Sequence, residues 1–307
     1  MLHAIGCLLL LVSIATGLVP SSPFQTLKIA QVVDPRDGST GSATAGLGKA
    51  SLCVILPQLG DFDTAEYCEQ LIACEKEMAE AQLDWRIIGI GDVNSAKKFC
   101  KFTSLPLERL RMVQDSSLHE SLQLANGPDW DVPFDFFPET VFGLNTRAWL
   151  NYMAMCAGLY APGTLREILR GYVGDKTAPE RLAEDEEVRA APVVITGTKR
   201  VKLGPFIEYD NLWASESGYQ RPVELATVRL RNMAEVLSNW KEYVPDDRHL
   251  AWRGATYLFD GEDLEYEHRT PGVLTYSATP SRPLSFLEPR IGKKALNPLG
   301  FSDPRGM

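Results

Sequence analysis

Two acidic residues and a threonine follow the first long apolar run of the sequence. The run is Leu52-Cys53-Val54-Ile55-Leu56, and Asp61-Phe62-Asp63-Thr64 comes shortly after it. Two carboxylates this close can hold different pKa values, as general acid–base chemistry requires. However, Asp63-Thr64-Ala65-Glu66 is also a capping box, a pattern that predicts the start of a helix. Helix capping explains Asp63 more simply, and we interpret the turn in this way.

Cysteine is the other residue type with a reactive side chain here. Cys68 lies one helical turn after Thr64, so it is a candidate for a displaced nucleophile. At that position it has lost the helix end that would lower the pKa of its thiol, and we favour a buried structural role. We also predict core packing for the cysteines in apolar runs, namely Cys53, Cys74, Cys100 and Cys156.

The arrangement of cysteine and histidine gives no sign of a metal site or a cofactor. The 6 cysteines form no CxxC pair, and the 4 histidines are His3, His119, His249 and His268, which are widely spaced. Zinc and haem sites have short, defined ligand spacings, which this sequence lacks. We therefore expect neither a metal nor a bound cofactor.

The composition is typical of a soluble globular protein. The 307 residues are 45% hydrophobic and 23% charged, with a formal net charge of -9. A nucleic-acid surface needs clustered lysine and arginine, so this balance argues against nucleic acid as a partner.

The first fifty residues differ in composition from the rest. Residues 1–17 contain a short apolar core, typical of a signal peptide and too short to span a bilayer, so we expect no transmembrane span in the mature protein. Residues 18–50 are rich in serine, threonine and glycine and poor in acids, and we predict a disordered, transit-like segment. The two together predict targeting to a plastid (chloroplast), with secretion as the alternative.

Alternating strands and helices follow. Apolar runs predict strands at 52–56, 85–90 and 110–113. Between them, helical spacing predicts one helix from Asp63 to Ala81 and a shorter one capped by Asn94 or Ser95. This order predicts a parallel α/β sheet.

The second half of the chain is predicted to hold a helical insertion and a hairpin. Helical patterns occur at 149–159, 165–172 and 223–244, within an insertion that spans 116–244. Strands at 255–259 and 264–268 form a β-hairpin, which is marginally stable alone. We therefore place the hairpin at the edge of the first sheet, in a single domain that spans 51–290, followed by an irregular tail at 291–307.

This plan and several sequence segments resemble the peroxiredoxin-like AhpC/TSA proteins, particularly plastid and cyanobacterial members. The resemblance covers Leu52 to Leu287. The segments that carry it are LPQLGDFD (56–63), FCKFT (99–103), MCAG (155–158), LRGYVGD (169–175), GYQRPVELAT (218–227), LSNW (237–240) and RPLSFL (282–287). The resemblance implies a thioredoxin-like three-layer α/β/α fold with the helical insertion before the final hairpin.

The resemblance also implies where an active site would lie. Peroxiredoxins carry their cysteine in the pattern P-x-x-x-T-x-x-C, and relatives carry C-x-x-C at the same turn. Counted from Pro57, these positions are Asp61 and Thr64, and neither is cysteine. Trp252-Arg253-Gly254 resembles the segment whose arginine orients peroxide. Arg253 could therefore pair with Asp61. An ordinary arginine at a strand edge is the alternative.

Two classes of function remain open. One is a noncatalytic or regulatory plastid protein that binds an unknown protein partner or a small molecule and lacks the usual peroxidase activity. The other is a thiol-dependent antioxidant oxidoreductase that uses Cys68. A homodimer, formed through a sheet edge or the long helix, is possible in either class.

Overall fold

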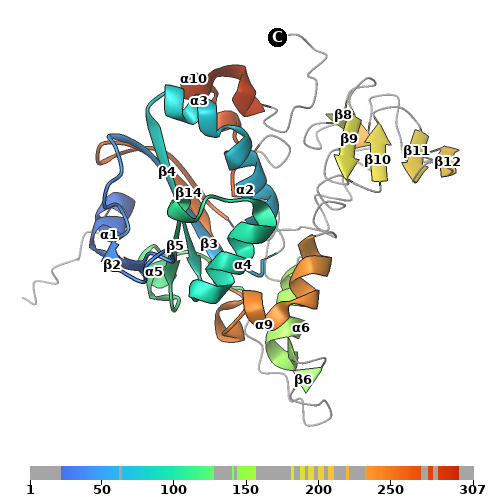
Figure 1. Cartoon of the computed structure of the whole chain (residues 1–307), viewed down its shortest axis with the longest axis horizontal. Helices are drawn as coiled ribbons and strands as arrows, with labels where there is room; N and C mark the ends of the chain where they lie inside the picture. The colour runs from blue at the N-terminus through green and yellow to red at the C-terminus, as the bar shows by residue number, and fades with distance from the viewer. Residues whose placement is uncertain are drawn as a thin grey trace, which may run out of the picture.

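A mixed seven-stranded sheet forms the centre of the protein (Figure 1). The computed structural model describes residues 22–61, 64–127, 140–141, 144–156, 181–182, 187–190, 193–196, 200–203, 207–210, 219–220, 232–270, 276–278 and 283–296. The sheet has the order β15-β14-β3-β4-β5-β1-β2. Its strands are β1 (Gln31–Val33), β2 (Thr40–Ser42), β3 (Ala50–Gln58), β4 (Leu83–Ile90), β5 (Leu110–Val113), β14 (Ala255–Asp260) and β15 (Asp263–Arg269).

The three predicted apolar strands form the parallel core of this sheet. β3 pairs with β4, and β4 with β5, all in parallel. Every residue of β3 after Ala50 is buried, because strands in such a core are covered on both faces. Alternate side chains of β3 enter two separate cores: Leu52 and Val54 pack in one, Cys53 and Ile55 in the other. The prediction of a parallel α/β sheet is confirmed.

The late hairpin lies where the sequence predicts it. β14 runs antiparallel to β3, with Ala255 opposite Ile55, and β15 forms the outer edge. The hairpin joins a strand pair that is already buried, and this supplies the apolar partners that it lacks alone.

Helices cover both faces and give the predicted three layers. On one face lie α2 (Thr64–Ala73), α3 (Glu75–Glu80) and α4 (Val93–Thr103), and on the other lie α1 (Pro23–Ile29) and α5 (Ser117–Ser121). The cap of α4 is Asp92, and not Asn94 or Ser95 as predicted. Its side chain accepts a hydrogen bond from the backbone N–H of Ser95 at 2.8 Å, while the Ser95 hydroxyl accepts one from the backbone of Asp92.

The prediction of disorder over residues 18–50 is wrong from Ser22 onward. These residues form α1, β1 and β2, and β1 pairs with β5 inside the main sheet. Arg86 on β4 donates hydrogen bonds to the backbone oxygens of Ala43 and Ala45 at 2.8 and 2.9 Å, which fixes a segment with little apolar bulk. The folded domain therefore begins before residue 51. The signal-like residues 1–17 lie outside the described residues.

Two predicted helices are interrupted. The helix expected from Asp63 to Ala81 divides at Cys74 into α2 and α3. Of the helix expected at 223–244, the described residues form a helix at 232–238 and α9 (Trp240–Tyr243), with a break at Asn239. Apolar spacing alone does not reveal such breaks, because the stripe continues on both sides of each.

The insertion is not wholly helical. It holds α6 (Thr146–Cys156), which confirms most of the helix predicted at 149–159, whereas the helix predicted at 165–172 lies outside the described residues. It also holds an antiparallel sheet of order β12-β11-β10-β9 and two strand pairs. These strands are β6 (Thr140–Val141), β7 (Leu144–Asn145), β8 (Arg181–Leu182), β9 (Glu187–Ala190), β10 (Val193–Thr196), β11 (Arg200–Leu203), β12 (Ile207–Asp210) and β13 (Tyr219–Gln220).

Short helices occupy the start of the predicted irregular tail. α10 (Glu288–Ile291) ends at the first residue of this tail, and a 3-10 helix follows at Gly292–Leu296. The rest of the tail, 297–307, lies outside the described residues. Shorter 3-10 helices are found at Leu107–Arg109, Asp247–His249 and Ser285–Leu287. No helix in the described part of the chain has both the length and the apolar character needed to cross a bilayer.

Candidate functional site

The turn after β3 brings Asp61 to the carboxyl end of the parallel strands. The backbone N–H of Asp61 donates to the carbonyl oxygen of Gln58 at 2.9 Å, which closes the turn. Gly60 is required within it, because a Cβ at this position would lie 2.3 Å from a methyl carbon of Val244. The close approach of Val244 and the turn together direct the chain back into the interior, and Asp61 is only 2% exposed.

Arg253 meets Asp61 in the interior. Arg253 Nη1 lies 2.6 Å from Asp61 Oδ2, and each side chain is 1% exposed. The remaining guanidinium nitrogens are also used: Nη2 donates to the carbonyl oxygen of Leu250 at 3.2 Å, and Nε to that of Ala251 at 3.3 Å. The ion pair that the sequence suggested is therefore present, and it is completed by backbone acceptors.

The charge of Asp61 keeps the arginine ionised. Burial alone would lower the pKa of Arg253, but the nearby carboxylate of Asp61 outweighs this effect and raises the pKa above its ordinary value. A buried arginine is stable only with such a partner, since removal of one member leaves an uncompensated charge in the interior.

Tyr152 of α6 completes the cluster, and the sequence analysis did not identify it. Its hydroxyl donates to Asp61 Oδ1 at 3.3 Å, and the centre of its ring lies 6.0 Å from Arg253 Cζ. Trp149 on the same helix packs edge-on against Trp240, with ring centres 5.7 Å apart. The only available signal was the apolar pattern of the predicted helix, which does not indicate which of its residues reaches the turn.

Thr64 lies at the start of α2 with its side chain fully buried. Its hydroxyl donates to the carbonyl oxygen of Asp61 at 2.7 Å. A capping side chain would instead accept a hydrogen bond from a backbone N–H, so this contact of Thr64 is not a helix cap. Asp63 lies outside the described residues.

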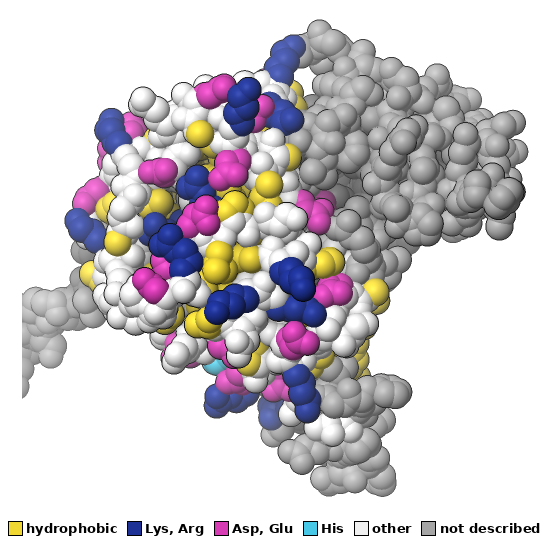
Figure 2. Space-filling model, in the orientation of Figure 1, with side chains coloured by type: hydrophobic (Ala, Val, Ile, Leu, Met, Phe, Trp, Pro, Cys, Tyr) yellow, Lys and Arg dark blue, Asp and Glu magenta, His cyan; other side chains and the backbone are white. Residues whose placement is uncertain are grey.

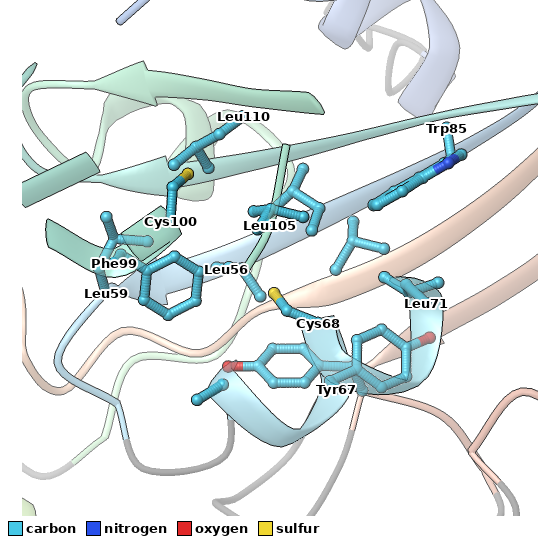
Figure 3. Packing of buried hydrophobic residues seen from close by; sticks show 14 of the residues in the cluster. Leu56, Leu59, Tyr67, Cys68, Leu71, Trp85, Phe99, Cys100, Leu105 and Leu110 are labelled. Carbon is cyan, nitrogen blue, oxygen red and sulfur yellow. The ribbon is translucent and has the colours of Figure 1, made fainter. Parts of the chain in front are cut away.

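Cys68 points into the packed interior, as Figure 3 shows. It is 0% exposed, and burial raises the pKa of its thiol well above the ordinary value. The nucleophile in thiol chemistry is the thiolate, so this environment disfavours reaction with peroxide. The described side chains of Cys53, Cys74 and Cys100 are also buried in the core, which confirms their predicted packing role. The side chain of Cys156 is not among those described.

His119 bonds the backbone near the end of β3. It is 0% exposed, and burial lowers the pKa of its imidazole to about 4, so the ring is neutral. Its Nε2 lies 2.8 Å from the carbonyl oxygen of Leu56, which assigns the proton to that nitrogen. His119 was noted in the sequence only as one of four scattered histidines, and its contact is structural.

The described residues hold no cluster of metal ligands. No group of three His, Cys, Asp or Glu side chains there could hold a metal ion. On the face in Figure 2, Lys and Arg side chains are interspersed with Asp and Glu. The arrangement of Asp61, Arg253 and Tyr152 supplies a sealed ion pair and no described nucleophile.

Most of the chain matches the model of one protein family. A family model described as AhpC/TSA antioxidant enzyme matches residues 70–272, more than half of the chain. The matched range includes Arg253 and begins after Asp61, Thr64 and Cys68. No curated protein matches this sequence.

Among solved structures, a cysteine-to-serine mutant of peroxiredoxin Q from Xanthomonas campestris is similar. The sequence identity is 14% and the TM-score is 0.27, and the match covers 35% of this chain. It spans 66% of the length of that peroxiredoxin.

Proposed function

Because the chain belongs to the AhpC/TSA antioxidant enzyme family, we propose that it is a noncatalytic thioredoxin-fold member that binds a partner protein or a small molecule. In this proposal, the buried ion pair of Asp61 and Arg253 lies where catalytic relatives have their reactive thiol. The observation that carries the proposal is the contact of 2.6 Å between Arg253 and Asp61.

Peroxidase chemistry of the usual kind needs a thiolate at the first turn of the helix after the first core strand. Backbone N–H groups at that turn and a nearby positive charge lower the pKa of a thiol. This chain has Thr64 at that turn, and a hydroxyl is a far weaker nucleophile towards peroxide. The positive charge of Arg253 is already matched by Asp61, so it is not free to polarise a substrate.

Binding through the insertion is supported by α6. This helix sends Tyr152 inward to the ion pair, while Leu150 and Met153 on the same helix are each 39% exposed. A partner that binds the exposed side of α6 would therefore contact the same helix whose Tyr152 bonds the buried ion pair.

A gain-of-function experiment tests whether Asp61 keeps the site unreactive towards peroxide. We expect the natural chain to consume peroxide no faster than buffer. Thr64→Cys alone should add a thiol of low reactivity, because Asp61 still neutralises Arg253. The double variant Asp61→Thr/Thr64→Cys restores the T-x-x-C pattern, and it should react with peroxide at least about tenfold faster than Thr64→Cys, since one pKa unit corresponds to a tenfold change in thiolate. Equal rates for the two variants would remove the role we give to Asp61.

The competing use of Cys68 has its own test. We expect no sulfenylation of Cys68 when the folded chain meets peroxide at neutral pH, followed by mass spectrometry of the modified peptides. Cys100→Ser is the matched control for Cys68→Ser, since both thiols are buried in the same core. Rapid peroxide consumption that Cys68→Ser abolishes and Cys100→Ser retains would overturn the noncatalytic proposal.

We further propose that the protein acts in a plastid and that its targeting signal ends before Ser22. The leader-like composition of residues 1–17 supports a targeting signal, and the participation of residues 22–50 in the folded domain supports its end before Ser22. A cut near Lys49 would remove α1, β1 and β2 from the domain. A fluorescent fusion of residues 1–21 should reach the plastid as well as a fusion of residues 1–49. Retention of both fusions outside the plastid would contradict the proposal.

A further inference from the structure

A second polar site lies at the opposite end of the central sheet. A cavity of 620 Å³ opens beside the first residues of β3 and β4, within the range of about 300–1,000 Å³ typical of small-molecule sites. Asp61 follows the other end of β3, so about 26 Å of strand separates the cavity from the buried ion pair. The two sites are therefore distinct.

The first unusual feature of this cavity is the indole N–H of Trp85. Trp85 lines the cavity and is only 2% exposed, yet its Nε1 has no acceptor among the described residues. A buried donor without a partner is unfavourable and rare in folded proteins. In Figure 3 the nitrogen lies on the edge of the ring that points away from Cys68 and Leu105. The carbon side of the ring packs in the core, and no group of the described residues accepts a hydrogen bond from the nitrogen.

The second feature is Arg109, which lies over the same indole. Arg109 Cζ is 5.0 Å from the centre of the Trp85 ring. Its bonds within the protein are long: 3.3 Å to Glu75 Oε1 from both Nε and Nη2, and 3.5 Å to the backbone oxygen of Trp85. A guanidinium has five N–H donors, so this group retains the capacity to bind an anion.

Two more cations line the cavity. Arg290 on α10 and Lys49 before β3 both contribute to its wall. Each has an acidic neighbour: Arg290 bonds Glu265, and Lys49 Nζ lies 3.1 Å from Asp260. Among the described residues that line the cavity, the other carboxylate besides Asp260 is Asp84.

The pleat of β4 determines where Asp84 points. Leu83 and Trp85 pack in the core beneath α2, α3 and α4, so Asp84 between them faces the opposite side of the sheet. Its carboxylate is engaged there, because Oδ2 accepts the backbone N–H of Gly48 at 2.7 Å. The carboxylate of Asp84 is therefore directed away from the indole of Trp85 and the guanidinium of Arg109.

We propose that this cavity binds a small molecule through an oxyanion, a carboxylate or a phosphate, held by Trp85 Nε1–H and the guanidinium of Arg109. Arg290 and Lys49 line the same cavity, each beside its acidic partner. The inference does not depend on the proposed function, because none of these residues contacts Asp61 or Arg253 in the described structure.

Isothermal titration calorimetry on the full chain tests the site. Sodium phosphate and sodium succinate serve as separate probes, with sodium chloride as the control for ionic strength. We expect saturable binding of at least one oxyanion. Phosphate alone would identify a phosphorylated ligand, and succinate alone an organic acid. If neither probe saturates up to about 10 mM, which corresponds to a very weak interaction, the proposal is wrong.

Variants locate the binding. Arg109→Gln should weaken it by about tenfold or more, because it removes a charge-assisted contact. Trp85→Phe keeps an aromatic side chain but removes the N–H donor together with the five-membered ring of the indole, so it should weaken binding severalfold. Lys76→Gln is the matched control: it removes one positive charge from the neighbouring α3 outside the cavity and should leave affinity within about twofold.

Folding is checked separately for each variant by circular dichroism and urea midpoint. If Arg109→Gln is unstable, Arg109→Lys replaces it, since it retains the charge and loses the forked geometry. Unchanged affinity in a folded Arg109 variant would overturn the assignment. The peroxide assays do not involve the cavity and the titrations do not involve Asp61, so a failure of the proposed function and a failure of this site can be told apart.

Discussion

The two ends of the central sheet each place an arginine near a carboxylate, with opposite results. At the carboxyl end, Arg253 is 1% exposed and bonds Asp61 and two backbone oxygens at 2.6 to 3.3 Å. At the amino end, Arg109 is 26% exposed and its bonds to Glu75 are 3.3 Å long. Both arginines use all three of their nitrogens, so the contrast lies in burial and bond length. Arg253 is sealed in the interior and serves the fold, whereas the longer, partly exposed bonds of Arg109 can be exchanged for a ligand.

The largest effect that tests this contrast comes from breaking each ion pair. Asp61→Ala leaves Arg253 buried without its counter-charge and should lower the free energy of unfolding by about 3–5 kcal/mol. Glu75→Ala, which breaks the more exposed pair, should cost less than about 1 kcal/mol. Urea denaturation measures both.

A double variant separates the effect of the unpaired charge on stability from the effect of packing. Asp61→Leu/Arg253→Met replaces both charges with apolar side chains and should recover much of the loss caused by Asp61→Ala. A loss below about 1 kcal/mol for Asp61→Ala would remove the distinction between the two ends.

A charge cluster of intermediate burial provides a second, pH-dependent test. Asp34 is 9% exposed in its side chain and lies 2.6 Å from Arg36 and 3.1 Å from Arg111. The hydrogen bond from Arg36 is the main cause that lowers the pKa of Asp34 to about 2, against the opposing effect of burial. Since the pKa is lower in the folded state, the stabilisation is fully present above about pH 4 and is lost as the pH falls towards 2.

The matching variant is Asp34→Asn. After allowance for the exposure of Arg36, it should cost about 1–2 kcal/mol at neutral pH, and this difference from the natural chain should shrink between pH 4 and pH 2. Urea midpoints at a series of pH values measure it. A difference that stays constant over that range would show that Asp34 stabilises the fold without its charge.

The smallest expected effect concerns the hydroxyl of Tyr152. Tyr152→Phe removes a hydrogen bond of 3.3 Å to Asp61 and should lower the free energy of unfolding by about 1 kcal/mol. Tyr243→Phe is the matched control, since its hydroxyl bonds Glu235, whose side chain is 28% exposed. The control should change the urea midpoint less. A larger loss for the control would contradict the role of Tyr152 in the sealed site.

The elements that the sequence predicts well are those in which apolar content alone decides the structure. The runs at 52–56, 85–90 and 110–113 are strands because strands covered on both faces must be apolar throughout. The segment from Ser22 to Ala50 shows the opposite case. A few of its apolar side chains, such as Leu27 and Val32, join the second core, and bonds from distant strands, such as that from Arg86 to Ala43, hold it as well. Composition reveals neither kind of contact.

The residues of the candidate site also fall into a predictable group and an unpredictable one. The resemblance to a known family indicated Asp61, Thr64 and Arg253, because each occupies a position in a short motif. Tyr152 and His119 reach the cluster from elsewhere in the chain, and no local pattern indicates a contact between segments so far apart. The orientation of the Thr64 hydroxyl was also beyond prediction, since a threonine at a helix start can donate or accept a hydrogen bond.

The position of β14 in the chain has a consequence for synthesis. Ile55 and Ala255 are neighbours in the sheet, although 200 residues separate them in sequence. A chain growing on the ribosome therefore makes β3, β4 and β5 long before β14 exists, and one edge of the apolar strand β3 stays unpaired in that interval. Unpaired apolar edges are sites of aggregation. Chains that stop within the insertion should collect in the insoluble fraction, and chaperones that shield extended apolar segments should increase the yield of the complete protein.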